Sequence, residues 1–294
     1  MSPSPNVQAF FDPATATVTY LVSDPATKAA AIIDPVLDYE PKAALTSTAS
    51  ADAVLRAAKA QDLQVTWILE THAHADHLSA AHYLREKAGA KVGIGGNIAV
   101  VQKVFKPLFH AQDVVADGSA FEALFEDGEQ FQLGTLSVRV MHTPGHTPAC
   151  ITYVIGDAAF VGDTLFQPDY GTARADFPGG DAATLYRSIR RILDLPPSTR
   201  IFTGHDYLPA GRTLHAWEST VAGQRAHNVH IKDGVSEADF VAMRHARDAS
   251  LAPPLLILPS LQVNIRAGAL PPPDDDGHVY LRLPVNRLGQ RQAG

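Results

Sequence analysis

Four side chains that can bind a metal ion crowd one short segment of the chain, Thr71-His72-Ala73-His74-Ala75-Asp76-His77. This segment follows the apolar stretch Val65-Thr66-Trp67-Ile68-Leu69, which is short, β-branched and aromatic and therefore predicts a buried strand. If the chain stays extended, His72 and His74 project to the same side. Imidazoles and a carboxylate delivered together at a strand end predict a metal site, with ligands for two metal positions. The competing interpretation is a histidine-rich surface loop.

Three further candidate ligands also follow predicted strands. His146 lies in Thr143-Pro144-Gly145-His146, Asp163 in Val161-Gly162-Asp163-Thr164, and His205 in Thr203-Gly204-His205-Asp206. A Gly-His or Gly-Asp pair at a strand end is common turn chemistry, so each of these segments alone indicates little. Their shared position after a strand favours a common site.

The elements that must position these residues alternate between the periods of strands and helices. The first half reads as a βαβα order after an opening hairpin, and the second half as a further mixed unit, so that two such halves predict an αββα sandwich. We expect a catalytic core over residues 1–210 and a C-terminal extension of helices and a proline-rich tail over residues 211–294. The predicted strands cover 17–22, 29–34, 65–69, 91–94, 130–133, 136–141, 150–155, 158–161 and 201–202. The predicted helices cover 51–60, 78–87, 98–108, 182–193, about 212–225 and 237–249, before the tail at 252–273.

Composition excludes several classes of function. The 294 residues are 46% hydrophobic, which is ample for a sizeable core. A formal net charge of -7 without a basic stripe argues against nucleic-acid binding. The polar start and the short, proline-broken apolar runs predict neither a signal peptide nor a membrane span. The single cysteine, Cys150, excludes an intrachain disulfide and agrees with a reducing compartment, so we expect a cytoplasmic enzyme. A monomer and a homodimer both remain open.

The metal-site pattern resembles the His-x-His-x-Asp-His motif of the metallo-β-lactamase superfamily. His146, Asp163 and His205 match the later ligands of that superfamily in order and spacing. The stretch Ala173-Arg174-Ala175-Asp176-Phe177 resembles the Gly-Arg-Thr-Asp-Phe stretch of the persulfide dioxygenases, although Ala173 and Ala175 depart from it and Gly171-Thr172 are additional. The similarity extends to Asn264-Ile265-Arg266-Ala267-Gly268, and the chain looks like a bacterial subgroup related to the β-lactamase-hydrolase-like proteins.

This resemblance implies an activity and a cofactor. It implies one Fe(II) per chain, bound by His72, His146 and Asp163, and the oxidation of glutathione persulfide by O2 and water to sulfite and glutathione. Two imidazoles and one carboxylate leave coordination positions open for a sulfur ligand and dioxygen, whereas zinc offers no redox step. On this interpretation a further set of residues supports the iron or forms a vacant second metal site: His74, Asp76, His77 and His205.

Three residues are candidates for substrate binding. Arg174 either meets an anionic part of the substrate or pairs with Asp176 to anchor its loop. Tyr207 and Arg266 occupy motif positions suited to holding glutathione carboxylates, and a purely structural role is the alternative for each. Cys150 begins a predicted buried strand and is interpreted as a core residue instead of a sulfur carrier.

Two other functions compete with the dioxygenase. Because all the ligand types of a dinuclear site are present, a two-metal hydrolase of glutathione thioesters, similar to glyoxalase II, is the first alternative. The Arg174 to Phe177 segment and the proline-rich C-terminus favour the dioxygenase. A non-catalytic metal-binding or redox-sensing module is the second alternative, against which the complete ligand set argues.

Overall fold

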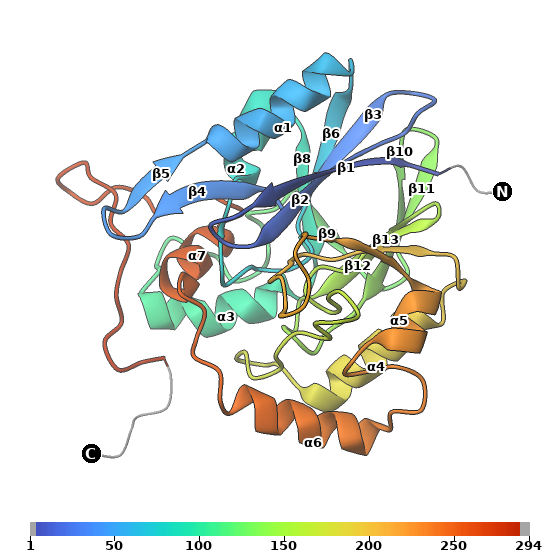
Figure 1. Cartoon of the computed structure of the whole chain (residues 1–294). Coiled ribbons are helices and arrows are strands. Elements are labelled where there is room, and N and C mark those ends of the chain that lie inside the picture. Colours follow the sequence, from blue (N-terminus) through green and yellow to red (C-terminus); the bar gives the residue numbers. More distant parts are fainter. Residues whose placement is uncertain (1–3, 289–294) are drawn as a thin grey trace.

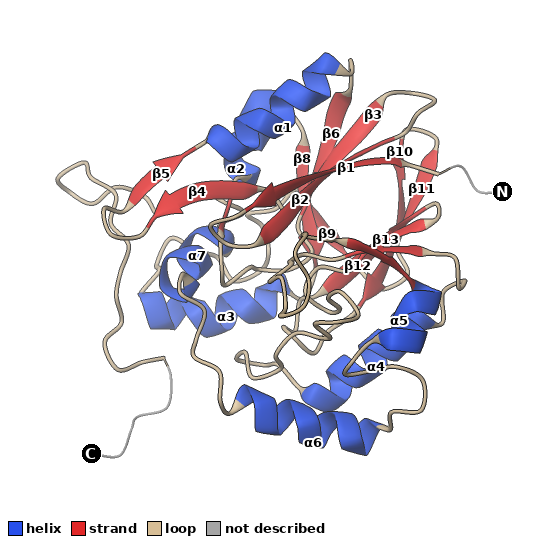
Figure 2. Cartoon of the chain, in the orientation of Figure 1, coloured by secondary structure: helices blue, strands red, loops and turns tan. Residues whose placement is uncertain are grey.

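The structure, a computed structural model, describes residues 4–288 and consists of two facing sheets with helices on both outer sides (Figures 1 and 2). The first sheet has the strand order β1-β2-β3-β6-β8-β9, and the second has the order β10-β11-β12-β13-β14-β15. In the first sheet the strands are β1 (Asn6–Asp12), β2 (Thr17–Ser23), β3 (Ala29–Ile33), β6 (Gln64–Leu69), β8 (Lys91–Gly95) and β9 (Ala123–Phe125). In the second they are β10 (Gln130–Leu133), β11 (Leu136–His142), β12 (Ile151–Ile155), β13 (Ala158–Phe160), β14 (Arg200–Phe202) and β15 (Glu218–Thr220).

Seven helices and a small third sheet complete the described part of the chain. The third sheet has the order β5-β4-β7 and projects beyond the first (Figure 1). Its strands are β4 (Val36–Glu40), β5 (Leu45–Ser47) and β7 (Leu78–Ser79). The helices are α1 (Ala49–Ala60), α2 (Ala81–Ala88), α3 (Ile98–Phe109), α4 (Ala182–Leu193), α5 (Val221–His227), α6 (Glu237–Asp248) and α7 (Ile257–Asn264). No described helix is both long and apolar enough to cross a bilayer.

Three apolar layers follow from strands that are buried on both faces. Along β2, Tyr20 and Val22 pack between the two sheets, whereas Leu21 packs under the helices of the first half. Along β13, Phe160 enters the same central layer and Ala159 faces α4, α5 and α6. Successive side chains of a strand point to opposite faces, so one strand serves two cores. The predicted αββα sandwich of the metallo-β-lactamase type is confirmed.

Several predicted elements are corrected by the structure. The helix expected over 78–87 begins only at Ala81, because Leu78 and Ser79 form β7 and pair with β4. The helix expected near 212–225 is instead β15 followed by α5. The proline-rich tail contains the buried helix α7. Strand β15 pairs with β14 at the edge of the second sheet, so part of the segment 211–294 belongs to the main body. The division at residue 210 stays a prediction.

Parallel pairing brings the candidate residues to one edge. Strands β3, β6, β8 and β9 run parallel to one another, and so do β13 and β14. The carboxyl ends of parallel neighbours lie at the same edge of a sheet. The loops after β13 and β14, which carry Asp163 and His205, therefore lie side by side. Backbone hydrogen bonds between the two sheets bring the loop after β6, with His72, to the same place: the Ile151 amide donates to the Thr71 carbonyl oxygen at 2.9 Å, and the Val18 amide to that of Gly204 at 2.8 Å.

Candidate metal centre

One group of three buried side chains has its ligand atoms within 4.8 Å of one another: His72, His146 and Asp163. The Nε2 atoms of both histidines lie 3.8 Å from Oδ2 of Asp163. The three residues come from the loops after β6, β11 and β13. The structure therefore brings together the predicted iron ligands.

The other ring nitrogen of each histidine has a partner that fixes its tautomer. His146 Nδ1 donates to the carbonyl oxygen of Arg174 at 2.8 Å. Thr71 Oγ1 donates its only proton to Asp34 at 2.8 Å, so it accepts from His72 Nδ1 at 3.0 Å. Both Nε2 atoms then carry a lone pair that faces Asp163, which is the usual arrangement of metal-binding histidines.

Unpartnered polar atoms show that this donor set fits a metal ion. His72 Nε2 and Asp163 Oδ1 are buried and have no hydrogen-bond partner among the described residues. Buried polar atoms nearly always have one, and both of these atoms belong to the same cluster. Burial, followed by the neighbouring charge of His74, holds the pKa of His72 well below its usual range. A neutral imidazole is the form that binds a metal.

A second group lies beside the first and consists of His74, Asp76, His77 and His205, again with ligand atoms within 4.8 Å. His205 Nε2 lies 3.0 Å from Asp76 Oδ2 and 3.3 Å from Asp163 Oδ1. Burial opposes protonation of His205, but the two carboxylates raise its pKa to about 9. Asp163 thus faces both groups, and together with Asp76 it attracts positive charge to the boundary between them.

Two buried carboxylates that sequence reasoning missed hold His74. His74 Nε2 lies 3.0 Å from Asp34 Oδ1 and 3.2 Å from Glu70 Oε2. Burial opposes a charge on His74, yet these carboxylates raise its pKa well above the usual value. Asp34 also accepts from the Thr71 backbone amide at 2.7 Å. The sequence did contain a signal for these two residues, because Asp34 directly follows the buried strand β3 and Glu70 directly follows β6.

A third missed residue, Asn264, comes from α7. Its Nδ2 donates to the carbonyl oxygens of His74 and His77, both at 2.8 Å, and its Oδ1 accepts from the Ser79 amide at 2.8 Å. All three groups are buried. The last residue of α7 therefore fixes the backbone of the histidine loop.

We expect Asn264→Ala to loosen this loop, because it leaves two buried carbonyl groups and one amide without partners. The predicted cost is at least about 2 kcal/mol of unfolding free energy, together with a roughly 10- to 100-fold loss of metal affinity. Urea unfolding and competitive chelator titration measure the two effects. Gln262→Ala is the matched control, because Gln262 lies on the same helix but contacts Leu258 and Arg282. An equal loss of metal affinity in both variants would contradict the role of Asn264.

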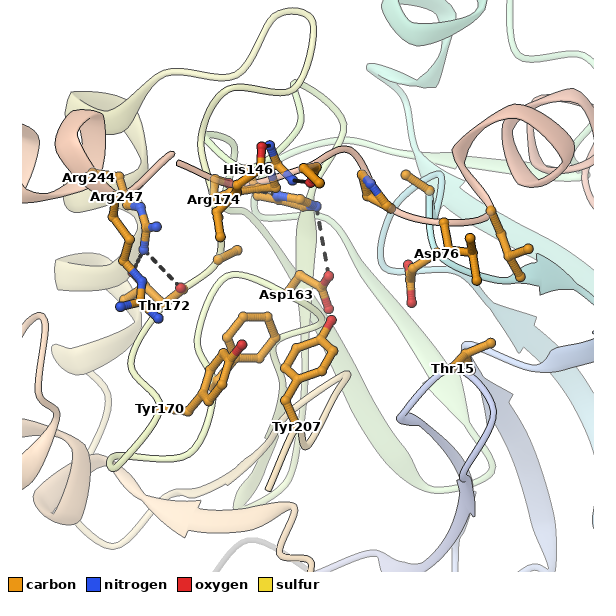
Figure 3. A pocket seen from close by; sticks show the side chains of 18 of the residues that line it. Thr15, Asp76, His146, Asp163, Tyr170, Thr172, Arg174, Tyr207, Arg244 and Arg247 are labelled. Carbon is orange, nitrogen blue, oxygen red and sulfur yellow. Dashed lines mark hydrogen bonds and ion pairs between the residues drawn. The ribbon is translucent and has the colours of Figure 1, made fainter. Parts of the chain in front are cut away.

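A cavity of about 340 Å³ opens onto both groups of residues and is lined by Asp76, His146 and Asp163 (Figure 3). Tyr207 lines it too, and its ring stacks on that of His205 with the centroids 5.3 Å apart. Further lining comes from the loop after α6, between Leu251 and Leu256, from the arginines of α6, and from the segment that contains Phe166, Tyr170 and Arg174. Members of both groups therefore face one cavity.

The predicted substrate-binding arginines differ in position. Arg174 lines the cavity, but its Nε and Nη2 donate to Asp176 at 2.5 and 2.7 Å, which is the structural pairing weighed for it above. The structure does not bring Arg266 to the cavity, because its guanidinium pairs with Asp113 at 2.7 Å. Cys150 is buried, and burial raises the pKa of its thiol to about 12. A thiol in that state fits the core role expected of it.

An αββα sandwich with clustered histidines and aspartates at its strand ends defines a class of metal-dependent proteins. The family model of the metallo-β-lactamase superfamily matches residues 12–205, and the chain belongs to this superfamily.

Similar proteins within the superfamily have names that point to different activities. A probable metallo-hydrolase of Burkholderia pseudomallei is 55% identical over 293 residues, which cover 96% of this chain and 99% of the relative. The mitochondrial persulfide dioxygenase ETHE1 of Bos taurus is 32% identical over 270 residues, which cover 91% of this chain and 90% of the relative. The crystal structure of ETHE1 from Myxococcus xanthus superposes with a TM-score of 0.72 at 30% identity, covering 90% of this chain and all of that one.

Proposed function

We propose that this protein is a persulfide dioxygenase. The observation that carries the proposal is the group formed by His72, His146 and Asp163, two imidazoles and one carboxylate with their free ligand atoms turned toward one another. This ligand set is typical of non-haem Fe(II) oxygenases and leaves neighbouring positions open. The similarity to ETHE1 over about nine tenths of both chains supports the same activity.

The proposed reaction converts glutathione persulfide, O2 and water into glutathione, bisulfite and one proton. The bond between the two sulfur atoms breaks, and the terminal sulfur receives three oxygen atoms. The sulfur pair loses four electrons in total, and these reduce O2. When bound, a single Fe(II) would supply the redox chemistry that dioxygen activation needs, which zinc lacks.

The residues of the chain prepare the cavity for this reaction. Thr71 and the Arg174 carbonyl orient His72 and His146 so that their lone pairs meet. Tyr207 points toward Asp163 (Figure 3) and offers a hydroxyl group to a polar ligand there. Leu251, Leu255 and Leu256 give one side of the cavity an apolar lining, which suits the methylene groups of a thiol substrate. The residues His74, Asp76, His77 and His205 support the ligands and handle protons.

A dinuclear hydrolase of glutathione thioesters is the second candidate. The observation that favours it is the second group of ligands, with Asp163 facing both groups. Two metal ions bridged by one carboxylate are typical of hydrolases that use a bound hydroxide. The name of the relative from Burkholderia pseudomallei points the same way.

The deciding experiment supplies glutathione persulfide to anaerobically iron-loaded protein and records oxygen uptake, sulfite and metal content on the same sample. Oxygen uptake matched by sulfite at about one iron per chain is the result expected for the dioxygenase. Hydrolysis of S-lactoylglutathione is assayed in parallel. Two metals per chain with rapid thioester hydrolysis and no oxygen uptake would transfer the assignment to the hydrolase.

A further inference from the structure

Three arginines line the cavity, and they differ in how much of their hydrogen-bonding capacity is used: Arg174, Arg244 and Arg247. Arg244 and Arg247 lie on one side of the cavity and Asp76 on the other, with His146 and Asp163 between them (Figure 3). A guanidinium has five N–H groups in a planar fork. The acceptors of each fork therefore decide which arginine remains available to a ligand.

Arg174 and Arg244 are committed to the protein. Besides Asp176, Arg174 donates to the carbonyl oxygens of Leu251 and Ala252 at 3.4 and 2.6 Å, which ties its loop to the cavity wall. Arg244 is 1% exposed and donates to Asp248 at 2.7 and 3.1 Å and to Thr172 at 3.1 Å. A carboxylate cannot form two parallel hydrogen bonds with either guanidinium unless some of these bonds break.

Arg247 is different. It lies one helical turn after Arg244 on α6, lines the cavity and is exposed. Its guanidinium forms no hydrogen bond or ion pair with any other of residues 4–288. The acidic residues that line the cavity, Asp76 and Asp163, lie away from it at the metal-ligand end (Figure 3). The cavity thus has an acidic end, which would hold a metal, and a cationic end with one unpaired guanidinium.

We infer that Arg247 binds the glycyl carboxylate of glutathione and so selects the carrier of the reacting sulfur. The inference rests on the proposed function only in one respect: it takes glutathione as the thiol that carries the reacting sulfur. The alternative function, hydrolysis of glutathione thioesters, uses the same thiol. A planar guanidinium matches a carboxylate with two parallel hydrogen bonds. Glutathione has two carboxylates, and the glutamyl carboxylate has an ammonium group beside it, whereas the glycyl carboxylate has none. The end of the cavity at Arg247 has no lining carboxylate that could bind an ammonium group, so it suits the glycyl end. A cavity of about 340 Å³ suits a small thiol instead of a protein persulfide.

The test measures binding of S-methylglutathione, a thioether that is not oxidised, to the iron-loaded protein by anaerobic calorimetry. We expect Arg247→Gln to weaken binding by roughly 10-fold or more, since a charge-assisted pair is lost. Arg247→Lys keeps the positive charge but lacks the planar guanidinium, so its affinity for S-methylglutathione should lie between those of the unmodified protein and Arg247→Gln. Arg187→Gln is the matched control: it removes the same charge from an exposed pair with Glu237, away from the cavity, and should bind as the unmodified protein does.

The glycine ethyl ester of S-methylglutathione identifies the carboxylate. The unmodified protein should bind the ester about as weakly as Arg247→Gln binds the acid, and Arg247→Gln should bind acid and ester equally. In turnover, Arg247→Gln should raise KM with little change in kcat.

Two outcomes would overturn the inference: Arg247→Gln and Arg187→Gln with the same affinity, or an unmodified protein that does not bind S-methylglutathione at millimolar concentration. If binding depends on Arg247 while glutathione persulfide is not oxidised, the dioxygenase proposal fails and the assignment of Arg247 stands.

Discussion

Asp163→Ala is expected to lose bound iron and to lower sulfite formation by more than about 100-fold, beyond the loss typical of residues that only support a metal ligand. The reason is geometric. Asp163 is the one carboxylate of the proposed iron ligands, and its oxygens also lie 3.3 Å from His205 and 3.8 Å from both His72 and His146. Removing it leaves the buried imidazoles of His72 and His146 without the carboxylate that faces them. Metal analysis and an anaerobic persulfide assay on the same sample check the result.

A comparison with His77→Ala makes this test specific. His77 belongs to the second group, so a protein with one iron should keep about one metal per chain in His77→Ala, with activity lowered by roughly 10- to 100-fold. A dinuclear enzyme should lose a metal in both variants. Cys150→Ser serves as the control for a buried change nearby, because Cys150 is a buried core residue outside both groups of ligands; it should keep both iron and sulfite production. An Asp163→Ala protein with full iron would refute the assignment of the ligands.

Arg244→Met is expected to reduce the free energy of unfolding by about 3–5 kcal/mol, because it leaves the carboxylate of Asp248 buried without its cation. Both partners are almost fully buried, at 1% and 7% exposure. Asp248 also accepts from the amide of Ala175 at 2.9 Å, and Arg244 from α6 holds Thr172. The pair of Arg244 and Asp248 therefore fixes residues 172–175. Because the Arg174 carbonyl in this segment orients His146, the affinity for metal should fall together with the free energy of unfolding.

Two further variants separate the buried charge from a general effect of losing an arginine. Arg187→Met breaks an exposed pair with Glu237 and should cost less than about 1 kcal/mol. The double variant Arg244→Met, Asp248→Leu also removes the buried carboxylate, and it should recover most of the free energy of unfolding that Arg244→Met loses. Chemical denaturation of all the variants gives the comparison. If Arg244→Met costs no more than Arg187→Met, the pair does not stabilise this segment.

The sequence was most informative where local pattern and tertiary structure agree. The helix predicted over 182–193 has those bounds in the structure, because an amphipathic repeat follows Asp181, whose side chain accepts from the Thr184 amide as an N-cap. The strand before the histidine motif was predicted within one residue of its start. The position of the candidate ligands after strands was therefore readable from the sequence, but the packing of the two sheets against each other brings the loops of both sheets together.

Segments whose structure depends on a distant partner were predicted wrongly. The segment at 218–220 was expected to be helical, but β14 supplies the hydrogen bonds that make it a strand. In the proline-rich tail, Pro259 is the third residue of α7, where the first amides of a helix have no intrahelical acceptor and proline costs little. Burial of Leu261 and Val263 then stabilises the helix, and no local pattern shows that burial.

The amino-acid sequence by itself determined the superfamily and the residues that can bind a metal, because the chemistry and spacing of those side chains are local properties. Only the tertiary structure decided which side chains are already occupied. It pairs Arg174 with Asp176 and Arg266 with Asp113 and leaves Arg247 without a partner among the described residues. It also brings Asn264 from a distant helix to the histidine loop. The partner of a polar group is set by packing across the whole chain, and a sequence pattern carries no record of it.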